Sequence, residues 1–122
     1  VDCLNGEPGI YSARYGGLSD EADRIKLILK KMEGVLERGA HFHCSIVFYI
    51  SNNLYKHFAG EVYGTLDYTE KGGNGFGYDV IFIPNGYKET FGELSSSIKN
   101  EISHRALAIK SFIKYLEDDF SN

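Results

Sequence analysis

The sequence of 122 residues lacks the features that mark several large classes of protein. It has no tryptophan, one methionine, two prolines and two cysteines, and no apolar run approaches the ~18 residues that a membrane span requires. These absences exclude collagen-like and disulfide-stapled chains and predict no membrane partner. Without secretory features, the cysteines Cys3 and Cys44 favour a reduced, cytoplasmic chain over a disulfide-bonded one.

An excess of positive charge is also lacking. Thirteen lysines and arginines face seventeen aspartates and glutamates, which gives a net charge of -4 and a pI near 5.5. A broad basic surface is needed to neutralise a nucleic-acid backbone. The many aromatic residues alone do not make single-stranded RNA a ligand, so we expect no nucleic-acid polymer as a partner.

A translation start is missing as well. The chain opens on Val1, and its one methionine is Met32. We therefore expect it to be a piece of a longer protein. Its length still suffices to bury about two thirds of the unfolded surface. With no linker or repeat inside it, the sequence predicts a single domain over residues 1–122.

Hydrophobic periodicity predicts a mixed succession of helices and strands. The fold class that follows is α/β, with a mixed, largely antiparallel sheet and flanking helices. The first predicted elements are a helix capped by Ser19 and ending at Gly34, an alternating strand over 41–50, and a turn at Asn52 and Asn53. One or two strands follow over 54–69, interrupted at Gly60 and Gly64, and then a strand over 79–83. The last predicted elements are a short helix that Ser95 to Ser97 can cap and that runs toward Ile102, and a longer helix from its cap at Ser103 to Glu117, with an apolar stripe of Ile109, Phe112, Ile113 and Leu116.

A glycine-rich stretch over residues 72–79 contains two aromatic residues and a carboxylate. Phe76 and Tyr78 offer flat stacking surfaces, and Asp79 offers a hydrogen-bond acceptor, a combination that suits a purine base. The stretch lacks the strand-before, helix-after context of a dinucleotide fingerprint. A mobile hairpin loop is the alternative interpretation.

Basic residues also stand where a helix is expected to begin. His104 and Arg105 follow Ser103 at the positive end of the helix dipole, where cations are disfavoured unless they meet an anion or an electron-rich carbonyl. Lys99 precedes them by about one helical turn. The alternative is a surface arginine beside a capping histidine. His41 and His43 share one face of a strand but have no third ligand near them in sequence, so no metal site is predicted.

Three segments, residues 5–15, 76–79 and 99–105, resemble the inosine triphosphate pyrophosphatase family in their order and spacing. The resemblance implies hydrolysis of ITP, dITP and XTP to the monophosphate and pyrophosphate, which cleanses the nucleotide pool. It also implies a Mg²⁺-dependent homodimer, with the substrate in the cleft between two lobes of an α/β fold.

By this resemblance, Phe76 stacks on the base, Tyr78 walls the pocket, and Asp79 and the later cations recognise the base and neighbouring groups. Hypoxanthine shows an acceptor at O6 and a donor at N1, and adenine inverts both, so buried hydrogen-bonding groups would reject adenine. The substrate-binding residues implied are Phe76, Gly77, Tyr78, Asp79, Lys99, His104 and Arg105.

The sequence also departs from the family pattern. Val80 stands where the family usually has proline, and Gly92 replaces a usual alanine. The family's phosphate-binding loop, acidic metal ligand and catalytic carboxylate are expected before Val1, so no catalytic residue or Mg²⁺ ligand is predicted within the chain. We therefore expect this chain, a truncated inosine triphosphatase-like fold, to carry the base-recognition half and to be inactive alone. A non-catalytic nucleotide-binding or dimerising module is the alternative.

Overall fold

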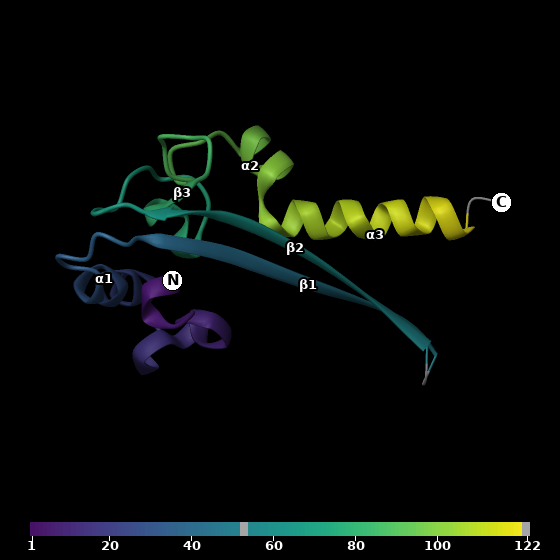
Figure 1. Ribbon diagram of the computed structural model, residues 1–122, viewed down its shortest axis with the longest axis horizontal. Helices are drawn as coiled ribbons and strands as arrows, with labels where there is room; N and C mark the ends of the chain where they lie inside the picture. The colour runs from purple at the N-terminus through teal and green to yellow at the C-terminus, as the bar shows by residue number, and fades with distance from the viewer. Residues whose placement is uncertain (52–53, 121–122) are drawn as a thin grey trace. The chain divides into compact units, whose positions relative to one another are not determined.

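The computed structural model describes residues 1–51 and 54–120, and Figure 1 labels its elements along the chain. β2 pairs antiparallel with β3, with Gly64 opposite Pro84 and Leu66 opposite Phe82. The sheet order is β1-β2-β3. The predicted fold class, a largely antiparallel sheet with flanking helices, is confirmed. The helices and strands are α1 (Glu21–Lys31), β1 (Gly39–Ser51), β2 (Leu54–Leu66), β3 (Phe82–Pro84), α2 (Ser96–Ile102) and α3 (His104–Phe120).

The chain divides into two compact units. The first unit comprises Val1–His41 and Tyr63–Ser96, and the second comprises Phe42–Val62 and Ser97–Asn122. The strands β1 and β2 each pass from one unit into the other. A single domain over residues 1–122 stays a prediction.

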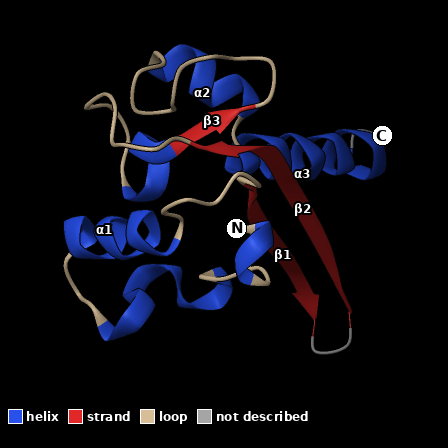
Figure 2. Cartoon of the chain, turned by 60° about the vertical axis from the view of Figure 1, so that its left-hand side comes forward, coloured by secondary structure: helices blue, strands red, loops and turns tan. Residues whose placement is uncertain are grey.

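In the first unit, α1 lies beside the segment Gly9–Gly17, as Figure 2 shows. Ile25 and Ile28 point from α1 into the core. The helix begins one residue later than predicted, because Asp20 rather than Ser19 provides the cap. The Asp20 carboxylate accepts a hydrogen bond from the Ala22 amide at 2.9 Å, which satisfies one of the free amides of the first turn.

The predicted strand over residues 79–83 is wrong in its first half. Residues Gly77–Ile81 form a 3-10 turn, and the strand β3 begins at Phe82. Two features of this segment favour the turn. Gly77 has a φ of +62°, which glycine adopts at little cost, and the Asp79 carboxylate binds the amide of Phe76 three residues earlier.

In the second unit, aromatic side chains pack α3 against the strands. Phe112 lies 5.3 Å from Phe48 and 5.4 Å from Phe58, measured between ring centroids. Phe112 of the predicted apolar stripe is thus packed on the strands. Two other residues of the stripe, Ile109 and Ile113, stay 42% and 46% exposed, so the stripe is only partly covered. The helix also continues past Glu117 to Phe120.

The remaining predictions about the elements have mixed outcomes. β1 alternates as predicted, with the side chains of His41, His43, Ser45, Val47 and Tyr49 on one face. β2 is one strand that continues through Gly60. The predicted turn at Asn52 and Asn53 lies outside the described residues. Within residues 1–51 and 54–120, no helix has the length and apolar character that crossing a bilayer demands.

Candidate functional site

The glycine-rich stretch forms a closed loop in the first unit. We call residues 71–80 the Gly-rich loop. The Lys71 amide donates to the Val80 carbonyl at 2.8 Å and so joins the two ends of the loop. Gly72, at φ +90°, lies against the backbone of Gly92, where a side chain would meet the Gly92 carbonyl. The Asn74 amide donates to the same carbonyl at 2.9 Å. The loop is therefore anchored at its ends and along its length.

Asp79 holds the backbone of Phe76. Its Oδ2 atom accepts a hydrogen bond from the Phe76 amide at 3.0 Å, and the aspartate is 5% exposed. The carbonyl of Asp79 accepts from the Gly92 amide at 3.0 Å. One oxygen of the predicted base acceptor therefore serves to orient the predicted stacking residue.

The Phe76 side chain borders a hollow that could receive a flat ligand. The ring is 59% exposed. The hollow has a volume of about 390 Å³, within the range of small-molecule sites, and is lined by the Gly-rich loop and the first turn of α1. Asp20, Glu21 and Glu70 contribute to this lining. Because these carboxylates repel phosphate, the hollow suits an uncharged base better than a polyphosphate.

Tyr78 joins the loop to the first motif of the sequence. Its hydroxyl donates to the Ser12 carbonyl at 2.7 Å, and burial raises the pKa of Tyr78. Nearby in this motif, the Tyr15 hydroxyl donates to Glu7 at 2.7 Å and accepts from Lys31 at 2.6 Å. Burial raises the pKa of Tyr15 as well. The structure therefore brings together two of the three motifs that carry the family resemblance.

The third motif lies in the second unit, around the start of α3. The Ser103 hydroxyl accepts from the Ala106 amide at 3.1 Å, which confirms the predicted cap. The His104 ring stacks on Phe42, with centroids 4.9 Å apart and planes 14° from parallel. Gly60 of β2 touches the backbone of His104, where a side chain would collide with the carbonyl. The start of α3 is thus fixed by close packing.

The lysine and the arginine of this motif differ in exposure. Lys99 is half-buried near the end of α2, and its carbonyl accepts from the Ser103 amide at 2.9 Å. Arg105 is exposed in the first turn of α3. The structure thus places Lys99 before, and His104 and Arg105 after, the junction of α2 and α3, while the convergence of their side chains on one ligand stays a prediction.

The histidines His41 and His43 of β1 lie next to acidic and hydroxyl side chains of the protein. His43 contacts Glu61 at 2.9 Å through Nδ1 and Ser45 at 2.8 Å through Nε2. His41 lies 3.7 Å from the Asp2 carboxylate. Among the described residues, no three histidine, cysteine, aspartate or glutamate side chains gather closely enough to hold a metal ion.

Comparison with known proteins identifies the family of this chain. The family model of the Ham1 family matches residues 1–115. The chain belongs to the Ham1 family. It is 40% identical to a dITP/XTP pyrophosphatase of Chlamydia abortus and 44% identical to one of Clostridium tetani, over 97% of this chain in both cases. The Staphylococcus aureus Ham1 protein has the same fold, with a TM-score of 0.93 and 40% identity over 98% of this chain.

The Ham1 relatives are longer than this chain. The aligned region spans 59% of the C. abortus protein, 61% of the C. tetani protein and 62% of the S. aureus structure. The chain thus spans about three fifths of the length of these relatives. The family resemblance drawn from the sequence is confirmed, whereas the roles of the predicted site residues stay predictions.

The two departures from the family pattern touch one another in this Ham1 chain. A Cβ atom added to Gly92 would lie 2.9 Å from Cγ1 of Val80 and 2.7 Å from the Lys71 carbonyl. Real Cβ contacts are essentially never this short. The branched side chain of Val80 therefore occupies space beside residue 92 that only glycine leaves open. Gly92 therefore lies at a position of close packing.

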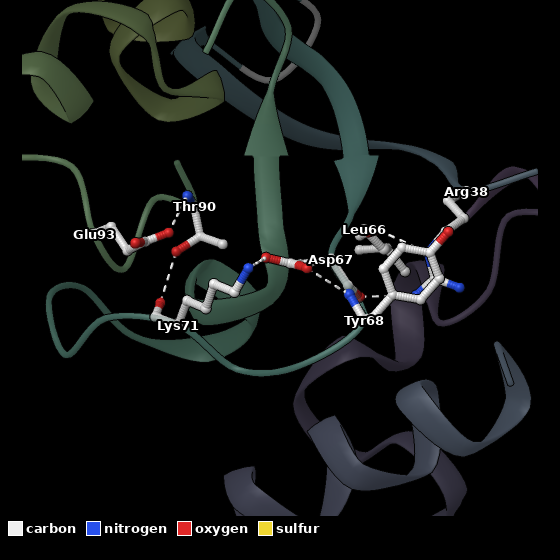
Figure 3. Close-up of polar contacts among 7 residues, drawn as sticks. All are labelled: Arg38, Leu66, Asp67, Tyr68, Lys71, Thr90 and Glu93. Carbon is white, nitrogen blue, oxygen red and sulfur yellow. Dashed lines mark hydrogen bonds and ion pairs between the residues drawn. The ribbon is translucent and has the colours of Figure 1, made fainter. Parts of the chain in front are cut away.

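Sequence reasoning missed a buried polar cluster at the end of β2, next to the start of the Gly-rich loop. Figure 3 shows Arg38 against the end of β2, where its guanidinium donates to the carbonyls of Leu66 and Asp67, both at 2.8 Å. The Asp67 carboxylate pairs with Lys71 at 3.1 Å, at the start of the loop. Only the i, i+4 spacing of Asp67 and Lys71 was visible in the sequence, and it gave no sign of Arg38.

Proposed function

We propose that the protein hydrolyses nonstandard purine nucleoside triphosphates, namely dITP, ITP and XTP, to the monophosphate and pyrophosphate. The 122-residue chain supplies base recognition. The observation that carries the proposal is the exposed ring of Phe76 at the edge of a hollow, held by a loop with closed ends. The names of the similar dITP/XTP pyrophosphatases supply the substrate class.

The proposed substrate-binding residues are those of the family motifs. In the first unit they are Phe76, Gly77, Tyr78 and Asp79, of which Phe76 stacks on the base. In the second unit they are Lys99, His104 and Arg105, and the cationic donors of Lys99 or Arg105 suit the O6 acceptor of a keto-purine. Adenine carries an amino group at that position, so it would leave such donors unpaired, which enforces rejection.

The proposed base site is tested by the binding of monophosphates to the purified chain. Calorimetry should show tighter binding of IMP than of AMP. Stacking on an aromatic ring is worth about 1–3 kcal/mol per base, so Phe76→Leu should weaken IMP binding at least fivefold. Tyr87→Leu is the matched control, because Tyr87 is an exposed aromatic residue of the same unit. Equal affinities for IMP and AMP would contradict the proposal.

The cationic motif is tested with the same ligand. Lys99→Met and Arg105→Gln should each weaken IMP binding, whereas Lys114→Met, an exposed lysine farther along α3, should leave it unchanged. If the variants of the second unit do not alter IMP affinity, the motif is a structural feature of the helix junction.

Hydrolysis by this chain alone is not part of the proposal. The described residues hold no group of three side chains that fits a metal ion, so we derive no step of the reaction through Mg²⁺ from them. Pyrophosphate release from ITP by the purified chain should equal the buffer blank, and release above it would refute the expected inactivity. Mg²⁺ dependence and homodimer formation stay predictions drawn from the family resemblance, and a cytoplasmic location stays a prediction drawn from the cysteines and the lack of secretory features.

A further inference from the structure

We propose that Thr90 is a positioning residue that holds the Gly-rich loop in the conformation that presents Phe76 to a base. The inference rests on the proposed function for its ligand, but its structural part can be tested without a ligand. Thr90 is not among the residues that the family motifs pointed to.

The hydroxyl of Thr90 binds the first residue of the loop. Its Oγ1 atom donates to the Lys71 carbonyl at 2.7 Å, as Figure 3 shows, and Thr90 is 0% exposed. Removing the buried hydroxyl leaves the Lys71 carbonyl facing an apolar side chain where it had a donor, which costs free energy. The Thr90 hydroxyl therefore anchors the start of the loop from the core, in addition to the backbone hydrogen bonds of Lys71 and Asn74.

Lys71 is the residue at which the loop closes. Its amide donates to the Val80 carbonyl, which brings the two ends of the loop together around Phe76. Its ammonium pairs with Asp67 at 3.1 Å, but the Lys71 side chain is 53% exposed, so this ion pair contributes little. The hydrogen bond from Thr90, whose side chain is fully buried, is the better shielded of the two side-chain contacts to Lys71.

Thr90 is itself fixed on a rigid part of the first unit. Its amide donates to the Glu93 carboxylate at 3.0 Å, and its carbonyl accepts from the amides of Glu93 and Leu94 at 2.9 and 3.0 Å. The next residue, Phe91, stacks on Phe82 of β3 with centroids 5.6 Å apart, and both rings are buried. Thr90 thus links the packed core of the first unit to the start of the Gly-rich loop.

Loss of the hydroxyl should increase the fraction of molecules in which the loop is open. The apparent affinity for a ligand falls in proportion to the fraction of protein in the binding-competent conformation. Thr90→Val keeps the shape of the side chain and removes the donor, whereas Thr90→Ser keeps the donor. We expect Thr90→Val to weaken IMP binding about tenfold and Thr90→Ser to stay within twofold of the wild type.

Hydrogen exchange separates positioning from general destabilisation. In Thr90→Val, the amides of Phe76 and Asn74 should exchange about tenfold faster, while the core amide of Ile28 in α1 keeps its rate. Thr69→Val is the matched control, because Thr69 is an exposed threonine of the same unit. It should change neither IMP affinity nor exchange.

Two results would overturn the inference. The first is a folded Thr90→Val variant with wild-type exchange at Phe76 and wild-type IMP affinity. The second, which needs no variant and applies if Thr90→Val does not fold, is exchange of the wild-type Phe76 amide as fast as that of the exposed Gly73. If the wild-type chain binds no IMP while Phe76 exchange still responds to Thr90→Val, the proposed function fails and the anchoring role stands.

Discussion

Replacing Arg38 by methionine should destabilise the first unit more than most single substitutions. The guanidinium donates to four backbone carbonyls, those of Leu66 and Asp67 at 2.8 Å, Met32 at 2.9 Å and Val35 at 3.2 Å. Leu66, Asp67 and Met32 are buried residues. The Met32 carbonyl keeps a hydrogen bond from the Val35 amide at 3.1 Å in the variant, whereas those of Leu66 and Asp67 lose their donor. At about 1–3 kcal/mol for each buried carbonyl left unsatisfied, these two add to at least about 2 kcal/mol.

Two further effects enter this estimate with opposite signs. Methionine removes the cost of burying a charge, which favours the variant. It also removes the stacking of Arg38 over Tyr68, where the guanidinium carbon lies 4.1 Å from the ring centroid. We therefore expect a net loss near the lower limit, about 2 kcal/mol. Arg38→Lys should lose less stability than Arg38→Met, because the lysine ammonium is still a hydrogen-bond donor. It should still lose some, because the ammonium cannot reach all four carbonyls.

Urea denaturation followed by circular dichroism measures this loss. Arg14→Met is the control, because Arg14 is an exposed arginine of the same unit, and a surface substitution changes stability by about 0.5 kcal/mol or less. An Arg38→Met chain that loses less than about 1 kcal/mol would show that water or chain movement satisfies the carbonyls. Arg38 would then not be the group on which their hydrogen bonding depends.

Three other predictions concern packing and pH. Gly92→Ala should cost about 1–3 kcal/mol by overpacking, and adding Val80→Ala should restore part of it, as thermal unfolding of the single and double variants would show. Gly60→Ala should destabilise the second unit and disturb the start of α3, visible as shifted His104 ring resonances. Gly73→Ala is the control, because Gly73 has open space where a Cβ would lie and no positive φ. Burial raises the pKa of Tyr15, so folding favours the neutral form of its hydroxyl. The resulting contribution to the free energy of unfolding is fully present below the unfolded pKa near 10 and is lost as the pH rises through the folded pKa. Tyr15→Phe should therefore flatten the alkaline decline of the urea midpoint, and an unchanged decline would contradict this.

The sequence predicted the elements best where a repeating pattern or a cap marked them. Alternation defined β1, and Ser103 defined the start of α3. The prediction failed where one side chain decided the backbone. The Asp79 carboxylate turns residues that look like a strand into a 3-10 turn, and its bond to the Phe76 amide has no periodic signature.

The candidate site shows the same division. Its chemical groups were visible in the sequence because aromatic, acidic and basic residues gather in short motifs. The buried polar residues around them were not visible, because Arg38 at the end of β2 and Thr90 at Lys71 bind backbone carbonyls that are far from them in sequence. Such contacts depend on where the chain folds back, which no local pattern records.

Support from the backbone also bears on how a hydrogen-bonding site could discriminate between purines. Rejection of adenine requires that mismatched groups stay in place and remain unpaired, because a loop that relaxes around the wrong base recovers part of the lost energy. The Gly-rich loop is closed by the Lys71 amide, packed on Gly92 without room for a side chain, and held by Thr90. Under the proposed function, a weakened Thr90 contact should therefore lower the ratio of IMP to AMP affinity as well as the affinity for IMP. A tenfold loss shared equally by both nucleotides would show that the anchor sets the population of the loop but not its selectivity.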